Sequence, residues 1–225
     1  MGALEILGEN AMADRGDAAE LLASHRELWD WRRRVAELYA SVRGIGQPKL
    51  AWQLWRQTRD ELFREHPQSP LEPAARERFE GLPAFDYDPG LRCLAWLEPI
   101  EVPAEHQWSG GRDGIIHMHA FARTEGLERS LGSELTLYWI AGYGGGVFLP
   151  FKDATSGRQT YGGGRYLLDG VKGADLGAAP DGRTILDFNF AYHPSCAYSE
   201  RWVCPLSPPE NTLPVAGRAG ERLMG

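Results

Sequence analysis

The chain has 225 residues, a formal net charge of −7, 43% hydrophobic residues and 24% charged residues. This composition excludes a disordered or fibrous chain, and the length predicts one domain with or without an appendage. Acidic residues outnumber basic ones by 31 to 24, so the clustered positive charge that nucleic-acid binding needs is missing. We therefore expect no nucleic-acid partner.

The N-terminal residues carry neither the basic region nor the apolar run of a secretory signal peptide. The longest uncharged run, 135–151, is interrupted by glycines and Pro150, which favours a strand, a turn and a strand over a membrane span. We expect a cytoplasmic protein without membrane insertion, in which the three cysteines are thiols first and disulfide partners second.

Residues 1–90 predict a helical N-terminal appendage followed by an extended linker. Asp14 or Asp17 is expected to cap a first helix that runs to about Val42. A heptad pattern indicates either an amphipathic helix lying on its own domain or a helix that forms a homodimer through residues 14–43. The seam positions are Leu21, Leu28, Val35 and Val42, with Ser24, Trp31 and Leu38 between them.

Two further helices are expected in this part of the chain. The second covers about 49–65 and ends at His66-Pro67, because a residue before proline avoids the helical region. Its shared face carries Trp52, Trp55, Arg59 and Leu62. A short third helix starts near Pro73 and stops at Gly81.

Residues 91–225 predict a glycine-rich antiparallel β domain that ends in a proline-rich C-terminal strap. The fold class is α+β: a helical N-terminal segment followed by a mostly antiparallel β-barrel or sandwich. The expected strands are 92–98, 115–123, 134–140, 147–151, 160–168 and 184–189.

Histidine spacing raises the question of a metal site. His117 and His119 share one face of a strand, and His193 is the candidate third ligand. The alternative is that both rings lie on a solvated strand face. Because only two ligands are close in sequence, we predict no metal and no other cofactor.

The thiols and one glycine-rich turn are the next candidates. Cys196 and Cys204 are eight residues apart, which allows two packed thiols, a disulfide, or a nucleophilic or metal-binding thiol. Tyr161-Gly-Gly-Gly-Arg165 lacks the spacing of a phosphate-binding loop, so hairpin geometry is the better interpretation. Strand alternation would place Asp187 and Asn189 on one face, where burial demands polar partners.

Several separated segments resemble one bacterial and archaeal family, described as domain of unknown function 1684. The motifs are 150–157, 160–167, 186–192, 194–198, 204–206, 209–211 and 218–222, with a similar helical lead-in from Trp55 to Phe85. His193 departs from the pattern, which has asparagine before the proline. The resemblance implies no particular activity, but it marks the signature positions Asp153, Thr155, Tyr161, Arg165, Asp187, Asn189, Tyr192, Cys196, Cys204, Asn211 and Glu221.

Three functions stay open on this basis. The first is a small-molecule-binding barrel with a polar site near Arg165, Asp187 and Asn189, whose ligand contacts come from Asp153, Tyr161, Arg165, Asp187, Asn189, Tyr192, Asn211 and Arg218. The second is a hydrolase-like enzyme in which Asp187 acts as acid or base with Cys196 or Tyr161. The third is an interaction protein that dimerises through its N-terminal helices.

Overall fold

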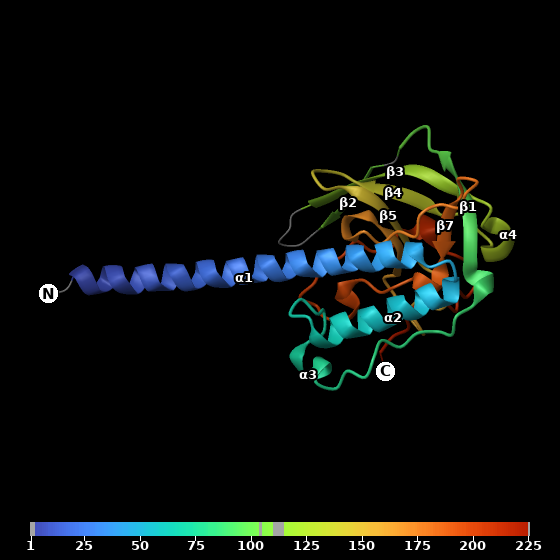
Figure 1. The fold of residues 1–225 in the computed structure, drawn as a ribbon. Coiled ribbons are helices and arrows are strands. Elements are labelled where there is room, and N and C mark those ends of the chain that lie inside the picture. The colour runs from blue at the N-terminus through green and yellow to red at the C-terminus, as the bar shows by residue number, and fades with distance from the viewer. Residues whose placement is uncertain (1–2, 104, 110–114, 225) are drawn as a thin grey trace.

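A computed structural model describes residues 3–103, 105–109 and 115–224 (Figure 1). A helical N-terminal segment precedes an antiparallel sheet that is nearly closed into a barrel. The helices are α1 (Ala3–Gly44), α2 (Pro48–Glu65), α3 (Pro73–Arg76) and α4 (Glu128–Leu131). The strands are β1 (Arg92–Pro99), β2 (Glu105–Ser109), β3 (Ile115–Glu125), β4 (Thr136–Ile140), β5 (Gly146–Phe151), β6 (Arg165–Asp169) and β7 (Thr184–Asp187).

The strand order is β6-β5-β4-β3-β1-β7, with β2 paired to β3, and every strand pair is antiparallel. The two ends of this order come together beyond β7. There the backbone of Tyr192 exchanges hydrogen bonds of 2.8 and 3.1 Å with Tyr166 of β6. The predicted α+β class with an antiparallel barrel is therefore confirmed.

The inner face of the sheet is filled with side chains. Leu and Phe residues from the strands pack there with Leu213 and Ala219 of the C-terminal tail, all of them buried. These buried side chains form one of the protein's hydrophobic cores. The strand residues in this inner core are Ala95, Ala122, Leu137, Leu149, Phe151, Leu167, Leu168 and Leu186.

Helices α1 and α2 run side by side and cover part of the outer face (Figure 1). Alternation along a strand sends neighbouring residues to opposite faces. Leu137 of β4 accordingly faces the inner core, whereas Tyr138 packs against the helices. Trp55 of α2 is buried in this outer core, and its indole N–H donates to the Tyr39 hydroxyl of α1 at 3.0 Å.

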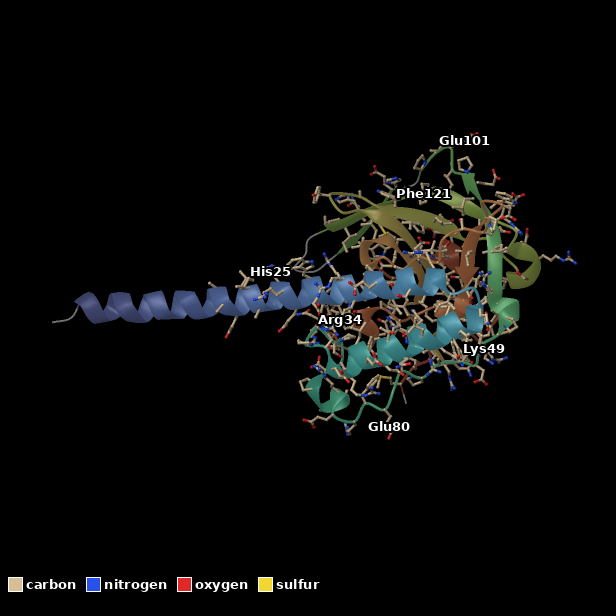
Figure 2. All side chains as sticks on the ribbon, viewed as in Figure 1. His25, Arg34, Lys49, Glu80, Glu101 and Phe121 are labelled. Carbon is tan, nitrogen blue, oxygen red and sulfur yellow. The ribbon has the colours of Figure 1, made fainter. Side chains whose placement is uncertain are left out.

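Helix α1 is longer than predicted and leaves the body of the protein. The expected start at Asp14 or Asp17 is wrong, because the helix begins at Ala3. The segment 3–13 is rich in Ala, Leu, Glu and Met, which favour helix and carry it past Gly8. Figure 2 shows His25 on the protruding part of α1, whereas Arg34 lies where the helix meets the body.

The heptad seam of α1 divides at the point where the helix meets the barrel. Val35, Leu38 and Val42 are buried in the protein's own core, as expected for an amphipathic helix on its own domain. Leu21 and Leu22, further out, keep 60% and 59% of their surface exposed. No helix in the described part of the chain has both the length and the apolar character of a membrane span.

Glycine and capping residues change several predicted boundaries. The strand expected from Thr160 begins only at Arg165, because residues 161–164 form a turn in which Gly164 has a φ of +101°. The strand expected to reach Asn189 ends at Asp187 and continues as a 3-10 turn over Phe188–Phe190. Helix α3 ends at Arg76, before Gly81, and β2 was not predicted.

Candidate functional site

Asp187 ends β7 with a buried carboxylate that is only half satisfied. Its Oδ1 accepts hydrogen bonds from the backbone N–H of Asn189 at 3.0 Å and from Asn189 Nδ2 at 2.7 Å. Its Oδ2 has no hydrogen-bond partner among the described residues. Arg92 Nε of the neighbouring strand lies 3.7 Å away and provides charge without a hydrogen bond.

The proximity of Asp187 and Asn189 has a different cause from the one predicted. The two residues meet because Asp187 caps the 3-10 turn that follows it, and not because a strand places them on one face. Asn189 then bonds the backbone of Asp88 in both directions at 2.8 Å. Since both ends of its amide are used, Asn189 positions the carboxylate of Asp187.

Burial raises the pKa of Asp187 above its usual value, while the amide and backbone N–H of Asn189 and the charge of Arg92 oppose this shift. A buried carboxylate oxygen without a donor is costly, and structures normally supply one. Oδ2 is therefore the atom of Asp187 that the described protein groups leave without a hydrogen-bond donor.

A cavity of about 180 Å³ lies beside Asp187, which is one of its lining residues. It is enclosed by the connection between α1 and α2 on one side and by β1 and β7 on the other. Polar and apolar atoms contribute about equally to its lining, which has one carboxylate and two guanidinium groups among apolar residues and consists of Val42, Arg43, Ile45, Gly46, Pro48, Ala51, Arg92, Leu176, Ile185, Asp187 and Phe190. Arg43 donates to the carbonyl of Asp175 at 2.7 Å, so its guanidinium is anchored at the rim.

Arg165, predicted to share a site with Asp187, belongs to a separate ion pair. Its guanidinium is buried and lies 2.7 Å from Asp153 Oδ2. It also donates to the tail carbonyls of Gly217, at 2.9 Å, and Ala219. Arg165 and Asp153 thus tie β6 to the C-terminal tail, and neither of them lines the Asp187 cavity.

Asn211 and Arg218, the predicted contacts from the tail, also lie apart from Asp187. Asn211 is buried and completes the sheet with its amide, accepting from the Thr136 N–H at 2.8 Å and donating to the carbonyls of Thr136 and Pro150 at 2.8 Å. Arg218 is exposed.

Tyr161, Cys196 and Cys204 form a further group on the outside of the barrel. The Cys196 thiol lies 3.7 Å from the Tyr161 hydroxyl oxygen. The structure contains Cys93, Cys196 and Cys204 as free thiols, each half-buried. Asp187 is not in contact with this group, so an acid or base role that joins Asp187 to Cys196 or Tyr161 has no geometric support.

Tyr192 and His193 lie in a network around Glu221. Tyr192 donates from its hydroxyl to Asp169 Oδ2 at 3.0 Å, and the guanidinium of Arg59 lies 4.8 Å from its ring centroid. Glu221 pairs with Arg59 at 2.6 Å and accepts from the His193 N–H at 2.8 Å. This network fastens α2 to the C-terminal tail.

The histidines considered as metal ligands do not come together. His117 is exposed and His119 half-buried on β3, whereas His193 is buried and accepts a hydrogen bond from the Tyr161 N–H at 3.2 Å. Among the described residues, no group of three or more His, Cys, Asp and Glu side chains is arranged to hold a metal ion.

Comparison with known proteins identifies the family. The model described as "Protein of unknown function (DUF1684)" matches residues 77–222. The chain belongs to this family. The solution NMR structure of an uncharacterised protein from Haloarcula marismortui is 36% identical, with a TM-score of 0.52 over 76% of this chain and 91% of that one. No curated protein matches the sequence.

The predicted resemblance to the DUF1684 family is thus confirmed, and the matched segment contains only part of the Asp187 cavity. Arg92 and Asp187 lie within it, whereas the α1–α2 connection that forms the opposite wall lies before it. Sequence reasoning missed Arg92 and Arg43. Arg92 faces Asp187 through antiparallel pairing across 95 positions of sequence, a contact with no local pattern to reveal it.

Proposed function

We propose that the protein binds a small, mostly apolar molecule that carries one hydroxyl group, in the cavity beside Asp187. The observation that carries this proposal is the buried Asp187 Oδ2, which has no partner among the described residues and belongs to a residue that lines the cavity. A ligand hydroxyl would supply the missing donor once the Asp187 side chain turns towards the cavity, because Oδ2 itself is buried from solvent in this structure.

Size and charge define the ligand class. A cavity of about 180 Å³ is smaller than typical sites for drug-sized molecules and comparable to one that accepts a single aromatic ring. The apolar side chains favour a hydrocarbon body. Arg43 and Arg92 already supply positive charge at the rim and wall, which favours a neutral hydroxyl over an ammonium group as the donor.

Phenol is the probe that tests this proposal, followed by NMR chemical shifts or by the rise in melting temperature. Saturable binding at millimolar concentration is expected, and Asp187→Asn should weaken it about fivefold, the value of one net hydrogen bond. Toluene, which lacks the hydroxyl, should bind equally to both proteins.

A pair of glycines provides the matched control. Gly46 lines the cavity and Gly44 does not, and an added Cβ would meet nothing within 4 Å at either position. Gly46→Leu should therefore abolish phenol binding, and Gly44→Leu should preserve it. Equal binding to the two variants, or no saturable binding to the wild type, contradicts the proposal.

A second candidate function is self-association through α1. The protruding stretch of α1 supports it, because Leu21, Leu22 and Trp29 are 59–69% exposed there and Leu21 continues the heptad seam. The partner inferred is a second copy, pairing through the outer part of the 14–43 segment, since Val35 and Val42 are occupied by the protein's own core.

Light scattering on the full chain tests this candidate. A dimer mass is expected for the wild type and a monomer mass for Leu21→Glu. Ala23→Glu adds the same charge off the seam and should leave the dimer intact. A monomeric wild type, or dissociation by both variants alike, refutes it.

A further inference from the structure

Three arginine side chains from separate segments line one cavity at the end of α2. Arg64 lies in the last turn of α2, Arg76 is the last residue of α3, and Arg201 follows the 3-10 turn Ser195–Ala197. The end of α2 and helix α3 lie next to each other (Figure 1). The cavity has a volume of about 460 Å³, which is within the range of sites for small molecules. Its other lining residues are Pro67, Ser69, Leu71, Pro73 and Glu77.

Contacts within the protein hold each of the three guanidinium groups in place. Arg76 Nε donates to the carbonyl of Arg64 at 2.6 Å. Arg201 Nη2 donates to the carbonyl of Ser69 at 2.7 Å. The guanidinium carbon of Arg64 lies 5.6 Å from the ring centroid of Phe79, a cation–π contact. Because these side chains are already restrained, a ligand that binds them removes less of their rotamer freedom.

These contacts leave most of the guanidinium N–H groups unused. A guanidinium has several more donors than the one that each hydrogen bond occupies, and they form a planar fork that fits the oxygens of a phosphate. Arg64 and Arg201 are exposed and Arg76 is half-buried. In the part of the chain that the structure describes, none of the three forms an ion pair with a carboxylate. Their remaining N–H groups can therefore bind an anion.

The charge of the cavity lining indicates a doubly charged anion. Three guanidinium groups face one carboxylate, that of Glu77, which leaves an excess of two positive charges. A phosphate monoester carries a charge of about −1.5 to −2 at pH 7 and matches this excess, whereas a carboxylate or a phosphodiester carries a single charge. Pro67, Leu71 and Pro73 provide apolar surface for the carbon part of such a molecule.

We propose that the cavity where Arg64, Arg76 and Arg201 meet binds a small, soluble phosphate monoester. Its described lining residues differ from those of the Asp187 cavity, so this site is independent of the binding function proposed above. A compact cluster of arginines on a chain of net charge −7 favours a small ligand over a nucleic acid, which requires positive charge along its backbone.

Isothermal titration calorimetry of the full chain with glycerol 3-phosphate at low ionic strength tests the proposal. We expect saturable binding at millimolar concentration or below. Arg201→Gln should weaken it about tenfold, the effect of losing one charge-assisted hydrogen bond. Arg78→Gln is the matched control, because Arg78 is an exposed arginine outside the cavity lining. It removes the same charge and should leave the affinity unchanged.

Glu77→Gln should have the opposite effect, because it removes the carboxylate from the lining. The affinity should rise about threefold, a gain that a loss of folding cannot produce. The methyl diester of the probe, which carries a single negative charge, should bind at least about fivefold more weakly than glycerol 3-phosphate.

Three results would overturn the proposal. The first is a wild type that shows no saturable binding of glycerol 3-phosphate, including the case in which it binds only to vesicles that contain phosphatidic acid. The second is equal weakening by Arg201→Gln and Arg78→Gln, which would show that only the overall charge of the protein matters. The third is unchanged or weaker binding to Glu77→Gln.

Discussion

His193 should make the free energy of unfolding depend on pH between about pH 4 and 6.5, because its pKa differs between the folded and the unfolded protein. Burial lowers its pKa from 6.5 to about 4, helped by the positive charges of Arg165 and Arg59 and opposed by Glu221. The Tyr161 N–H donates to Nε2 of the ring, so the neutral ring carries its proton on Nδ1. Protonation of Nε2 in the folded protein would break the hydrogen bond from the Tyr161 N–H. It would also bury a positive charge close to those of Arg165 and Arg59.

The sign and size of the effect follow from linkage. Between the folded and the unfolded pKa, the unfolded chain binds more protons, so stability falls as the pH falls from about 6.5 towards 4. With a pKa of about 4 in the folded protein and 6.5 in the unfolded chain, the free energy of unfolding falls by about 2 kcal/mol between pH 7 and pH 5.

The assay is urea denaturation of the wild type and His193→Asn at both pH values. Asparagine does not titrate and is the residue that the family resemblance leads us to expect at this position. The wild type should lose about 2 kcal/mol more free energy of unfolding than the variant on going from pH 7 to pH 5. His117→Asn, at an exposed position, should behave as the wild type does. If the wild type and His193→Asn show equal pH dependence, His193 is not held neutral by its surroundings, and the reasoning fails.

Two further predictions concern the tail and its contacts. Glu221→Gln leaves the buried guanidinium of Arg59 without a counterion and should cost about 3 kcal/mol in urea denaturation, whereas the exposed Glu200→Gln should be neutral. Gly220 and Gly157 both have a positive φ. A Cβ added at Gly220 would lie 2.4 Å from the carbonyl oxygen of Ala191, whereas a Cβ added at Gly157 would meet nothing within 4 Å. Gly220→Ala should therefore cost more than about 2 kcal/mol, and Gly157→Ala about 1 kcal/mol, by thermal unfolding.

Local patterns in the sequence predicted the helices and strands, but not the side-chain contacts between residues that are far apart in the sequence. The face of α2 that carries Trp52, Trp55, Arg59 and Leu62 is buried as its spacing predicts, because helical periodicity is a local property. The partner of Arg59 is 162 residues away at Glu221, and nothing near Arg59 indicates it. The strand that ends early at Asp187 shows the limit of alternation: its aspartate bonds the backbone two residues on and turns the chain.

For a related reason, the prediction of a single polar cluster around Arg165, Asp187 and Asn189 was wrong. Polar residues of a family signature were expected to converge on a ligand, but buried polar groups also persist because each needs a partner. Arg165 satisfies carbonyls of the irregular C-terminal tail, whereas Asn211 and Glu221, which belong to that tail, satisfy backbone groups of the strands and the charge of Arg59. A tail without regular secondary structure makes only scattered backbone hydrogen bonds, such as the one from the Leu213 N–H to the Lys152 carbonyl at 2.9 Å, so side chains pair further polar groups of the tail.

Residues that hold the structure differ from candidate ligand contacts in one property, namely whether their buried polar atoms are already paired. The carboxylate of Asp153 meets Arg165 and Thr155, and the amide of Asn189 is bonded at both ends. Asp187 differs, because one of its oxygens is buried without a donor in the described part of the chain and a cavity adjoins the residue. Retaining such a cost in a well-packed barrel favours a bound molecule that supplies the donor, which is why the binding test centres on this oxygen and on Gly46 across the cavity.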